Sequence, residues 1–199
     1  MSNETELKLL LAEEDHGLIL AAPCLAAFPR NEQHLANTYF DTPDHALNKA
    51  RVALRIRKKN GHFIQTLKTQ GESKNGLSRR GEWEWQLTEP VLDVTKLQTV
   101  WPESLHNIDI ASLEPVFCTD FIRQFSNVIW ENAEIELALD LGQVISEDKV
   151  AMISELELEL KKGNESALLS LADELRKLVE LIPGDISKAE RGYQLIGCE

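Results

Sequence analysis

Carboxylates recur at every second position in two stretches near opposite ends of the chain. Glu4 and Glu6 form the first pair, and Glu155, Glu157 and Glu159 form the second series. Side chains of a β-strand alternate between its two faces, so each series would share one face of its strand. Carboxylates that meet across a sheet repel one another unless cations lie between them. The two series therefore predict a metal site, and carboxylate oxygens favour Mg²⁺ or Mn²⁺.

Cationic side chains follow the same alternation in the middle of the chain. Arg55 and Arg57 share one strand face, and Arg80 shares another face with Glu82. Clusters of Arg and Lys favour phosphate or carboxylate oxygens, Arg through its bidentate fork. Cations beside metal-binding carboxylates predict a metal-chelated polyphosphate ligand. The sequence has no Walker A motif, so a P-loop enzyme is excluded.

Strands with one charged and one apolar face must position these residues. Asn60-Gly61 is a strong signal for a hairpin between two of them. The alternation predicts strands at residues 3–11, 35–40, 52–58, 63–68, 80–87, 116–123, 127–130, 134–141 and 155–161. Apolar spacing predicts helices at residues 13–27 and 165–181, and a short capped helix at 187–193.

A charged strand face has two interpretations. In a sheet or sandwich it would meet water. In a closed barrel whose apolar face is covered by helices, it must point inward. A charged interior is costly to dehydrate, so such a barrel would be a wet tunnel that binds a highly charged ligand. The cationic strands in mid-chain and the acidic strands near both ends favour the tunnel.

Length and composition set further bounds. The 199 residues predict one domain, residues 1–199. A net charge of −12 argues against binding of nucleic acid or of an anionic membrane. The cysteines Cys24, Cys118 and Cys198 form no C-x-x-C pair and indicate reduced thiols in a cytoplasmic protein. The longest apolar run, residues 17–28, contains Pro23 and is too short to span a bilayer.

The motifs together resemble the CYTH, or triphosphate tunnel metalloenzyme, superfamily. Glu4-x-Glu6-x-Lys8 is similar to its N-terminal signature. Further matches follow in the family's order: Tyr39-Phe40-Asp41-Thr42-Pro43, Leu54-Arg55-Ile56-Arg57, Thr66-Leu67-Lys68, Gly76-Leu77 with Arg80 and Glu82, Thr119-Asp120-Phe121 with Arg123, Ile135-Glu136 with Ala138 and Asp140, Glu155 to Glu159, and Ser187-Lys188-Ala189 with Arg191-Gly192-Tyr193. The resemblance is greatest to bacterial inorganic triphosphatases in which an all-helical CHAD domain follows the CYTH domain.

The resemblance implies an α+β fold with a closed eight-stranded antiparallel barrel and flanking helices. It also implies hydrolysis of triphosphate with Mg²⁺ or Mn²⁺. The implied metal ligands are Glu4, Glu6, Glu136, Glu157 and Glu159. The implied phosphate-binding residues are Lys8, Arg55, Arg57, Lys68, Arg80, Arg123, Lys188 and Arg191. Lys8, Glu6 and Glu157 would serve catalysis, with metal-bound hydroxide, Lys8 or a glutamate as the general base.

Two alternatives to an inorganic triphosphatase stay open at this point. One is another activity of the same fold, thiamine-triphosphatase or adenylyl cyclase, which needs a pocket for an organic group beside the tunnel. The other is a non-catalytic polyphosphate-binding module. The expected partners are a small triphosphate and, in a longer chain, a C-terminal CHAD domain.

Overall fold

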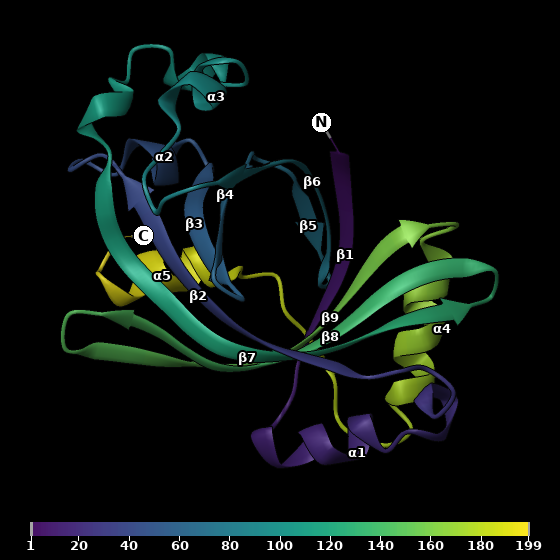
Figure 1. Cartoon of the computed structure of the whole chain (residues 1–199). Helices are drawn as coiled ribbons and strands as arrows, with labels where there is room; N and C mark the ends of the chain where they lie inside the picture. The colour runs from purple at the N-terminus through teal and green to yellow at the C-terminus, as the bar shows by residue number, and fades with distance from the viewer. Residues whose placement is uncertain (1, 199) are drawn as a thin grey trace.

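Eight antiparallel strands close into a barrel in the computed structural model, which describes residues 2–198 (Figure 1). Around the barrel the order is β1-β9-β8-β7-β2-β3-β4-β6, and β6 pairs with β1 to close it. The eight strands are β1 (Ser2–Leu10), β2 (Asn31–Asp41), β3 (Ala53–Lys59), β4 (His62–Lys68), β6 (Leu77–Leu87), β7 (Glu114–Trp130), β8 (Ala133–Ser146) and β9 (Lys149–Lys162).

Short elements decorate this barrel. Two small strands, β5 (Glu72–Lys74) and β10 (Ile182–Pro183), add to β6 and β1. The helices are α1 (His16–Leu20), α2 (Ala46–Lys49), α3 (Val94–Gln98), α4 (Ser166–Leu175) and α5 (Lys188–Leu195), with 3₁₀ turns at Glu13–Asp15, Pro23–Leu25, Glu103–Leu105 and Ile110–Ser112. None of the helices in residues 2–198 is both long and apolar enough to cross a membrane.

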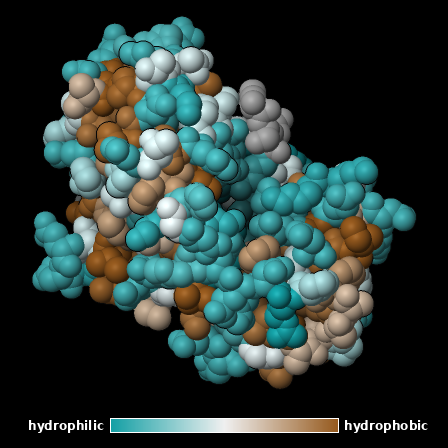
Figure 2. Space-filling model, viewed as in Figure 1, coloured by the Kyte–Doolittle hydropathy of each residue, from teal (hydrophilic) through white to brown (hydrophobic). Residues whose placement is uncertain are grey.

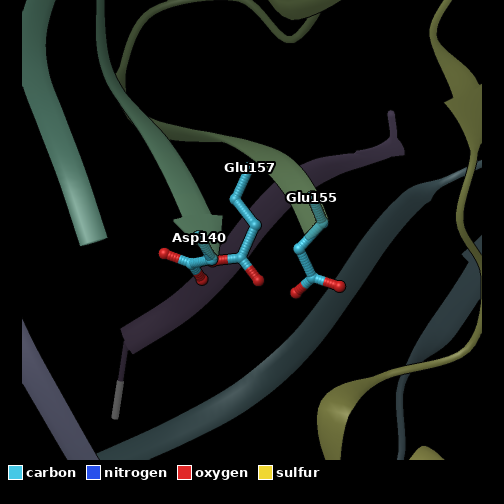
Figure 3. A group of neighbouring side chains, drawn as sticks. All are labelled: Asp140, Glu155 and Glu157. Carbon is cyan, nitrogen blue, oxygen red and sulfur yellow. The ribbon is translucent and has the colours of Figure 1, made fainter. Parts of the chain in front are cut away.

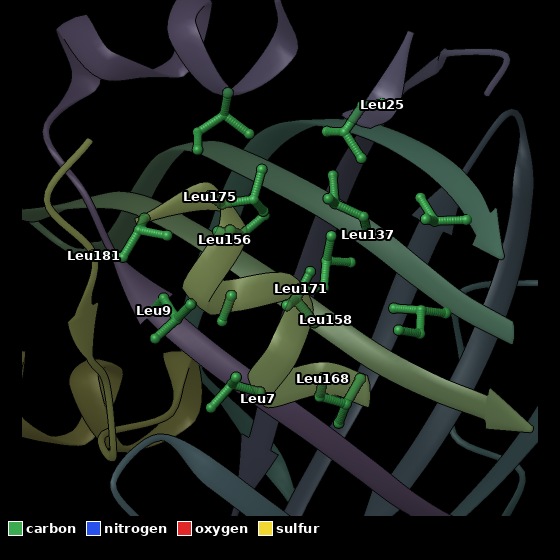
Figure 4. Packing of buried hydrophobic residues seen from close by; sticks show 14 of the residues in the cluster. Leu7, Leu9, Leu25, Leu137, Leu156, Leu158, Leu168, Leu171, Leu175 and Leu181 are labelled. Carbon is green, nitrogen blue, oxygen red and sulfur yellow. The ribbon is translucent and has the colours of Figure 1, made fainter. Parts of the chain in front are cut away.

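The largest hydrophobic core lies outside the barrel. The apolar faces of β1, β8 and β9 point outward and pack against α4 and the N-terminal helical turns (Figure 4). Leu7 and Leu158 come from the strands, and Leu168, Leu171 and Leu175 come from α4, where they lie on one helix face. Because the apolar residues face out, their polar neighbours in the strands face in. The alternation thus confirms the predicted tunnel.

Local signals correctly located one tight turn and the start of one helix. Asn60 and Gly61 both have positive φ, 50° and 81°, as the two-residue turn between β3 and β4 requires. At the start of α5, Ser187 accepts a hydrogen bond from the Glu190 backbone amide, and the Glu190 carboxylate accepts one from the Ser187 amide. This reciprocal capping box confirms the predicted start of the C-terminal helix.

Three sequence expectations were wrong in extent. The predicted division into two strands at 116–123 and 127–130 is absent, because β7 runs unbroken through both and pairs with β8 along the whole stretch; pairing overrides the local polar residues. The predicted helix at 13–27 is divided into short turns, with Pro23 starting a separate 3₁₀ turn. The helix predicted at 165–181 is shorter, since α4 ends at Leu175.

Candidate functional site

The barrel encloses a charged cavity of about 270 Å³. All eight barrel strands and the start of α5 contribute side chains to it, and hydrophilic residues surround the hollow visible in Figure 2. Its cationic lining residues among those described are Lys8, Arg55, Arg57, Lys59, Lys68, Arg80, Arg123, Lys161 and Lys188. Its acidic lining residues are Glu4, Glu6, Glu82, Glu84, Glu136, Glu157 and Glu159.

One wall of the tunnel is a row of carboxylates. The strand register places Glu136 of β8 opposite Glu159 of β9, and Glu159 opposite Glu6 of β1. Like charges directly opposite each other in a sheet are destabilising. Glu159 is partly neutralised by Lys161, whose ammonium lies 2.6 Å from its carboxylate. The row as a whole is therefore a place where a further cation would be stabilised.

Glu6 is the member of this row that none of the described cations contacts directly. Among residues 4–198, whose side chains are described, it has no hydrogen-bond or ion-pair partner, and only 6% of it is exposed. Burial, with the charges of Glu157 and Glu4, raises the pKa of Glu6 to about 7. The charges of Arg80 and Lys68 offset this rise only in part, so an added cation would further stabilise the charged form of Glu6. The chemistry of Glu6 thus fits a ligand of a hard divalent metal.

The opposite wall carries crowded cations. Burial, with the neighbouring guanidinium groups of Arg55 and Arg123, lowers the pKa of Arg57 to about 9. The Nε atom of Arg55 is buried and has no hydrogen-bond partner. Arg57 donates from Nε to Oδ1 of Asn37 at 2.7 Å, which fixes the direction of its guanidinium. This wall would be stabilised by an anion with several oxygens.

The tightest acidic cluster is already neutralised by the protein itself. Asp140, Glu155 and Glu157 offer oxygens within 4.8 Å of one another (Figure 3). The ammonium of Lys188 contacts all three, at 2.6 Å from Asp140 and 2.8 Å from Glu157. Arg123 adds two hydrogen bonds of 2.7 Å to Asp140. Since these cations occupy the cluster, a metal fits better beside Glu6 than between these three residues.

Most of the predicted site residues line the cavity. These are the five predicted metal ligands, Glu4, Glu6, Glu136, Glu157 and Glu159, and seven of the eight predicted phosphate-binding residues, Lys8, Arg55, Arg57, Lys68, Arg80, Arg123 and Lys188. Glu4 is held by Lys68 and Arg80 at 2.8 and 2.9 Å. Arg191 is not among the lining residues and pairs instead with Glu155.

Strand parity alone would have identified several residues that the sequence analysis missed. Lys161 lies two positions after Glu159, and Lys59 lies two positions after Arg57, so each pair shares a strand face. Asn37 gave no such signal, because its importance depends on the pairing of β2 with β3, which brings it opposite Arg57.

Known proteins resemble this chain along nearly its whole length. The family model described as "CYTH domain" matches residues 2–193. An inorganic triphosphatase of Haemophilus influenzae is 36% identical over 199 residues, which are 98% of this chain and 55% of that protein. A putative triphosphatase of Bacillus subtilis is 40% identical over 65 residues, 33% of each chain. The chain thus spans about half the length of the first of these curated relatives and matches a third of the second.

Solved structures share the fold at lower identity. A Hippeastrum protein, described as a putative adenylyl cyclase with a dominant triphosphatase activity, superposes with a TM-score of 0.70 at 18% identity, covering 98% of this chain and 97% of its own. A putative adenylate cyclase of Bacillus halodurans gives 0.63 at 22% identity, covering 96% and 98%. These structures share the fold, and the family match over residues 2–193 establishes that the chain belongs to the CYTH domain family.

Proposed function

We propose that this chain hydrolyses inorganic triphosphate to diphosphate and phosphate inside the tunnel, with the help of Mg²⁺ or Mn²⁺. The observation that carries the proposal is the pairing of two opposite deficits in one cavity. None of the described cations contacts the Glu6 carboxylate directly, while Nε of Arg55 has no hydrogen-bond partner and neighbouring guanidinium groups lower the pKa of Arg57. A metal-bound triphosphate would supply both. The relative from Haemophilus influenzae, named an inorganic triphosphatase, supports the same substrate.

The metal would be held on the carboxylate wall. Glu6 is the central proposed ligand, because it is buried and none of the described cations contacts it directly. A bound divalent cation would neutralise phosphate charge and favour ionisation of a bound water. The further proposed ligands are Glu4, Glu136, Glu157 and Glu159.

The cations would hold the phosphate chain from the other side. Arg57 is already fixed by Asn37, and Arg123 is fixed by Asp140, so little side-chain entropy is lost when a phosphate binds. Their charges would also stabilise the charge that develops on the phosphoryl oxygens during in-line attack. Lys8, Lys68, Arg55, Arg80 and Lys188 complete the proposed phosphate-binding set.

Lys8 is the side chain best suited to accept a proton. It lies on β1 directly opposite Glu157, and it is 6% exposed. Burial lowers the pKa of Lys8 below that of an ordinary lysine. A lowered pKa increases the fraction of unprotonated lysine, and the neutral amine can accept a proton from an attacking water.

A second cavity adjoins the tunnel and supports organic triphosphates as the second candidate substrate class. It measures about 780 Å³ and shares Lys8, Lys68 and Arg80 with the tunnel. An organic group attached to the last phosphate could lie there, while the three phosphates occupy the tunnel.

The test is phosphate release from tripolyphosphate, ATP and thiamine triphosphate, each with Mg²⁺, with Mn²⁺ and with EDTA. We expect metal-dependent release from tripolyphosphate above all. Preference for ATP or thiamine triphosphate would favour the organic class. Tight binding of tripolyphosphate without release from any substrate would identify a binding module.

The matched variants are Glu6→Gln and Glu134→Gln. Glu134 is an exposed carboxylate on β8 whose partner is Lys162, outside the tunnel. We expect Glu6→Gln to lower kcat by at least about 100-fold, since even groups that only orient a metal ligand cost roughly 10- to 100-fold when lost. Glu134→Gln should leave kcat unchanged. Full activity of Glu6→Gln would contradict the metal assignment.

A further inference from the structure

Helix α5 places one cation within the cluster of three carboxylates. Lys188, in its first turn, is 7% exposed, and its ammonium contacts Asp140, Glu155 and Glu157. It also lines the tunnel, at the end where α5 meets the barrel. The position of this ammonium therefore depends on how α5 is held against β8 and β9.

Arg191 lies three residues later on the same helix and makes different contacts. Its Nη2 atom lies 2.7 Å from Oε2 of Glu155, and its Nη1 atom donates to the backbone carbonyl of Met152 at 3.0 Å. Glu155 is fully buried. Neither Arg191 nor Glu155 lines the tunnel among the described residues. The pair lies behind Lys188, away from any substrate in the cavity.

We propose that Glu155 and Arg191 form a clamp that positions Lys188 at the tunnel end, so that Arg191 acts on the reaction through Lys188 and not by touching phosphate. The proposal rests on the proposed triphosphatase function. It replaces the role in phosphate binding that the resemblance implied for Arg191.

Charge balance explains why the clamp is needed. The register places Asp140 directly opposite Glu155, and both are fully buried. Two carboxylates in this arrangement require cations from elsewhere. Three cations contact the three carboxylates directly, and the charge of Lys8 acts on Glu155 and Glu157 as well; the contacting groups are Asp140, Glu155, Glu157, Arg123, Lys188 and Arg191. Loss of the Arg191 charge would leave Glu155 pulling Lys188 toward itself and away from Asp140 and Glu157.

The other end of α5 is anchored independently. A Cβ atom on Gly192 would lie 2.2 Å from the ring of Phe117, so the helix backbone packs directly on that ring. The hydroxyl of Tyr193 donates to Oδ2 of Asp41 at 2.6 Å. Because these contacts do not involve the clamp, α5 should stay attached when the clamp is cut, and only its first turn should shift.

The test compares Arg191→Met, Glu155→Gln and the double variant with the wild type. Steady-state kinetics on tripolyphosphate are measured together with hydrogen exchange of residues 188–195. Arg176→Met is the control, because Arg176 makes an exposed pair with Asp173 just after α4. Arg191→Lys tests rescue by a conserved charge.

We expect each single variant to raise KM about tenfold, with a smaller change in kcat, and to speed exchange in the first turn of α5. The double variant should be no worse than Glu155→Gln alone, because both changes cut one clamp. Arg191→Lys should recover most of the lost affinity. Arg176→Met should change neither kinetics nor exchange.

Additive effects on KM with unchanged exchange in α5 would overturn the proposal, since they would show that Arg191 contacts substrate itself. Unchanged KM and exchange in Arg191→Met would overturn it equally. If wild-type protein releases no phosphate from tripolyphosphate, the proposed function fails, and exchange in α5 still decides whether the clamp exists. If Glu155→Gln does not fold, Arg191→Met and Arg191→Lys carry the same test.

Discussion

Replacing Glu6 by Gln should stabilise the metal-free protein while abolishing its proposed activity. The folded structure raises the pKa of Glu6 from the usual 4.5 to about 7, through burial and the charges of Glu157 and Glu4. A shift of this size corresponds to about 3 kcal/mol of free energy of unfolding, taken as an order of magnitude. Gln keeps the shape of the protonated carboxyl and never becomes charged.

The sign of the effect depends on pH. Below about pH 4.5 Glu6 is protonated in both folded and unfolded chains, so its full contribution to stability is present. Between pH 4.5 and 7 the unfolded chain releases this proton and the folded chain keeps it, so stability falls as pH rises. Above pH 7 the ionised group carries the whole cost. The stability gain of Glu6→Gln should therefore grow from nearly zero at pH 4.5 to about 3 kcal/mol at pH 8.

The assay is urea unfolding in EDTA at pH 5, 6.5 and 8, for wild type, Glu6→Gln and the exposed control Glu134→Gln. In Mg²⁺ the order should reverse, because the wild type gains stability from a bound cation and Glu6→Gln does not. A gain that is independent of pH, or a loss of stability at every pH, would refute the reasoning. A gain independent of pH would mean that the titration of Glu6 is not its cause, and a loss at every pH would mean that Glu6 is compensated in the folded protein.

Three further variants separate the site from its scaffold. Asn37→Ala removes the acceptor that aims Arg57, and should raise KM for tripolyphosphate about tenfold, the effect of losing roughly 1–1.5 kcal/mol; an unchanged KM would show that Arg57 binds phosphate equally well without this hydrogen bond. Gly192→Ala places a methyl group against Phe117 and should lower the free energy of unfolding by about 1–3 kcal/mol, measured in urea; an unchanged midpoint would contradict this close packing. Leu171→Ala opens a cavity under α4 and should cost about 2–5 kcal/mol in stability, while KM of the still-folded protein stays the same, because this core lies outside the barrel.

The charged strand faces could be predicted because alternation is a local property. Glu4, Glu6, Glu157 and Glu159 share strand faces whatever their partners are, and parity also assigned Arg80 to the inside. The structure agrees, since Arg79 points outward and pairs with the exposed Glu165. The odd or even position of a residue in a strand predicts which face it lies on. The family resemblance was needed to predict that the strands close into a barrel.

Contacts between distant elements could not be predicted in the same way. Lys188 enters the cluster of Asp140 and Glu157 only because α5 packs against β8 and β9, and no local pattern encodes that packing. The continuity of β7 through Gln124 likewise depends on its pairing with β8. For the same reason Arg191, grouped in sequence with Lys188, was expected to bind phosphate but pairs with Glu155 and does not line the tunnel.

Glu6 and Glu157 show how the fold divides one tunnel into two electrostatic regions. Both carboxylates are buried, on paired strands and on the same inner wall. Although burial acts to raise the pKa of Glu157, Lys188 and Arg123 hold it well below its usual value, whereas the pKa of Glu6 is raised. The α5 end is thus neutralised by the protein's own cations, and the Glu6 end is left for an added one. A divalent metal that binds this tunnel should therefore depend strongly on Glu6 and only weakly on Asp140 or Glu155, which calorimetric titration of Mn²⁺ into Glu6→Gln and Asp140→Asn would measure; equal losses in both variants would show that Lys188 yields its place to the metal.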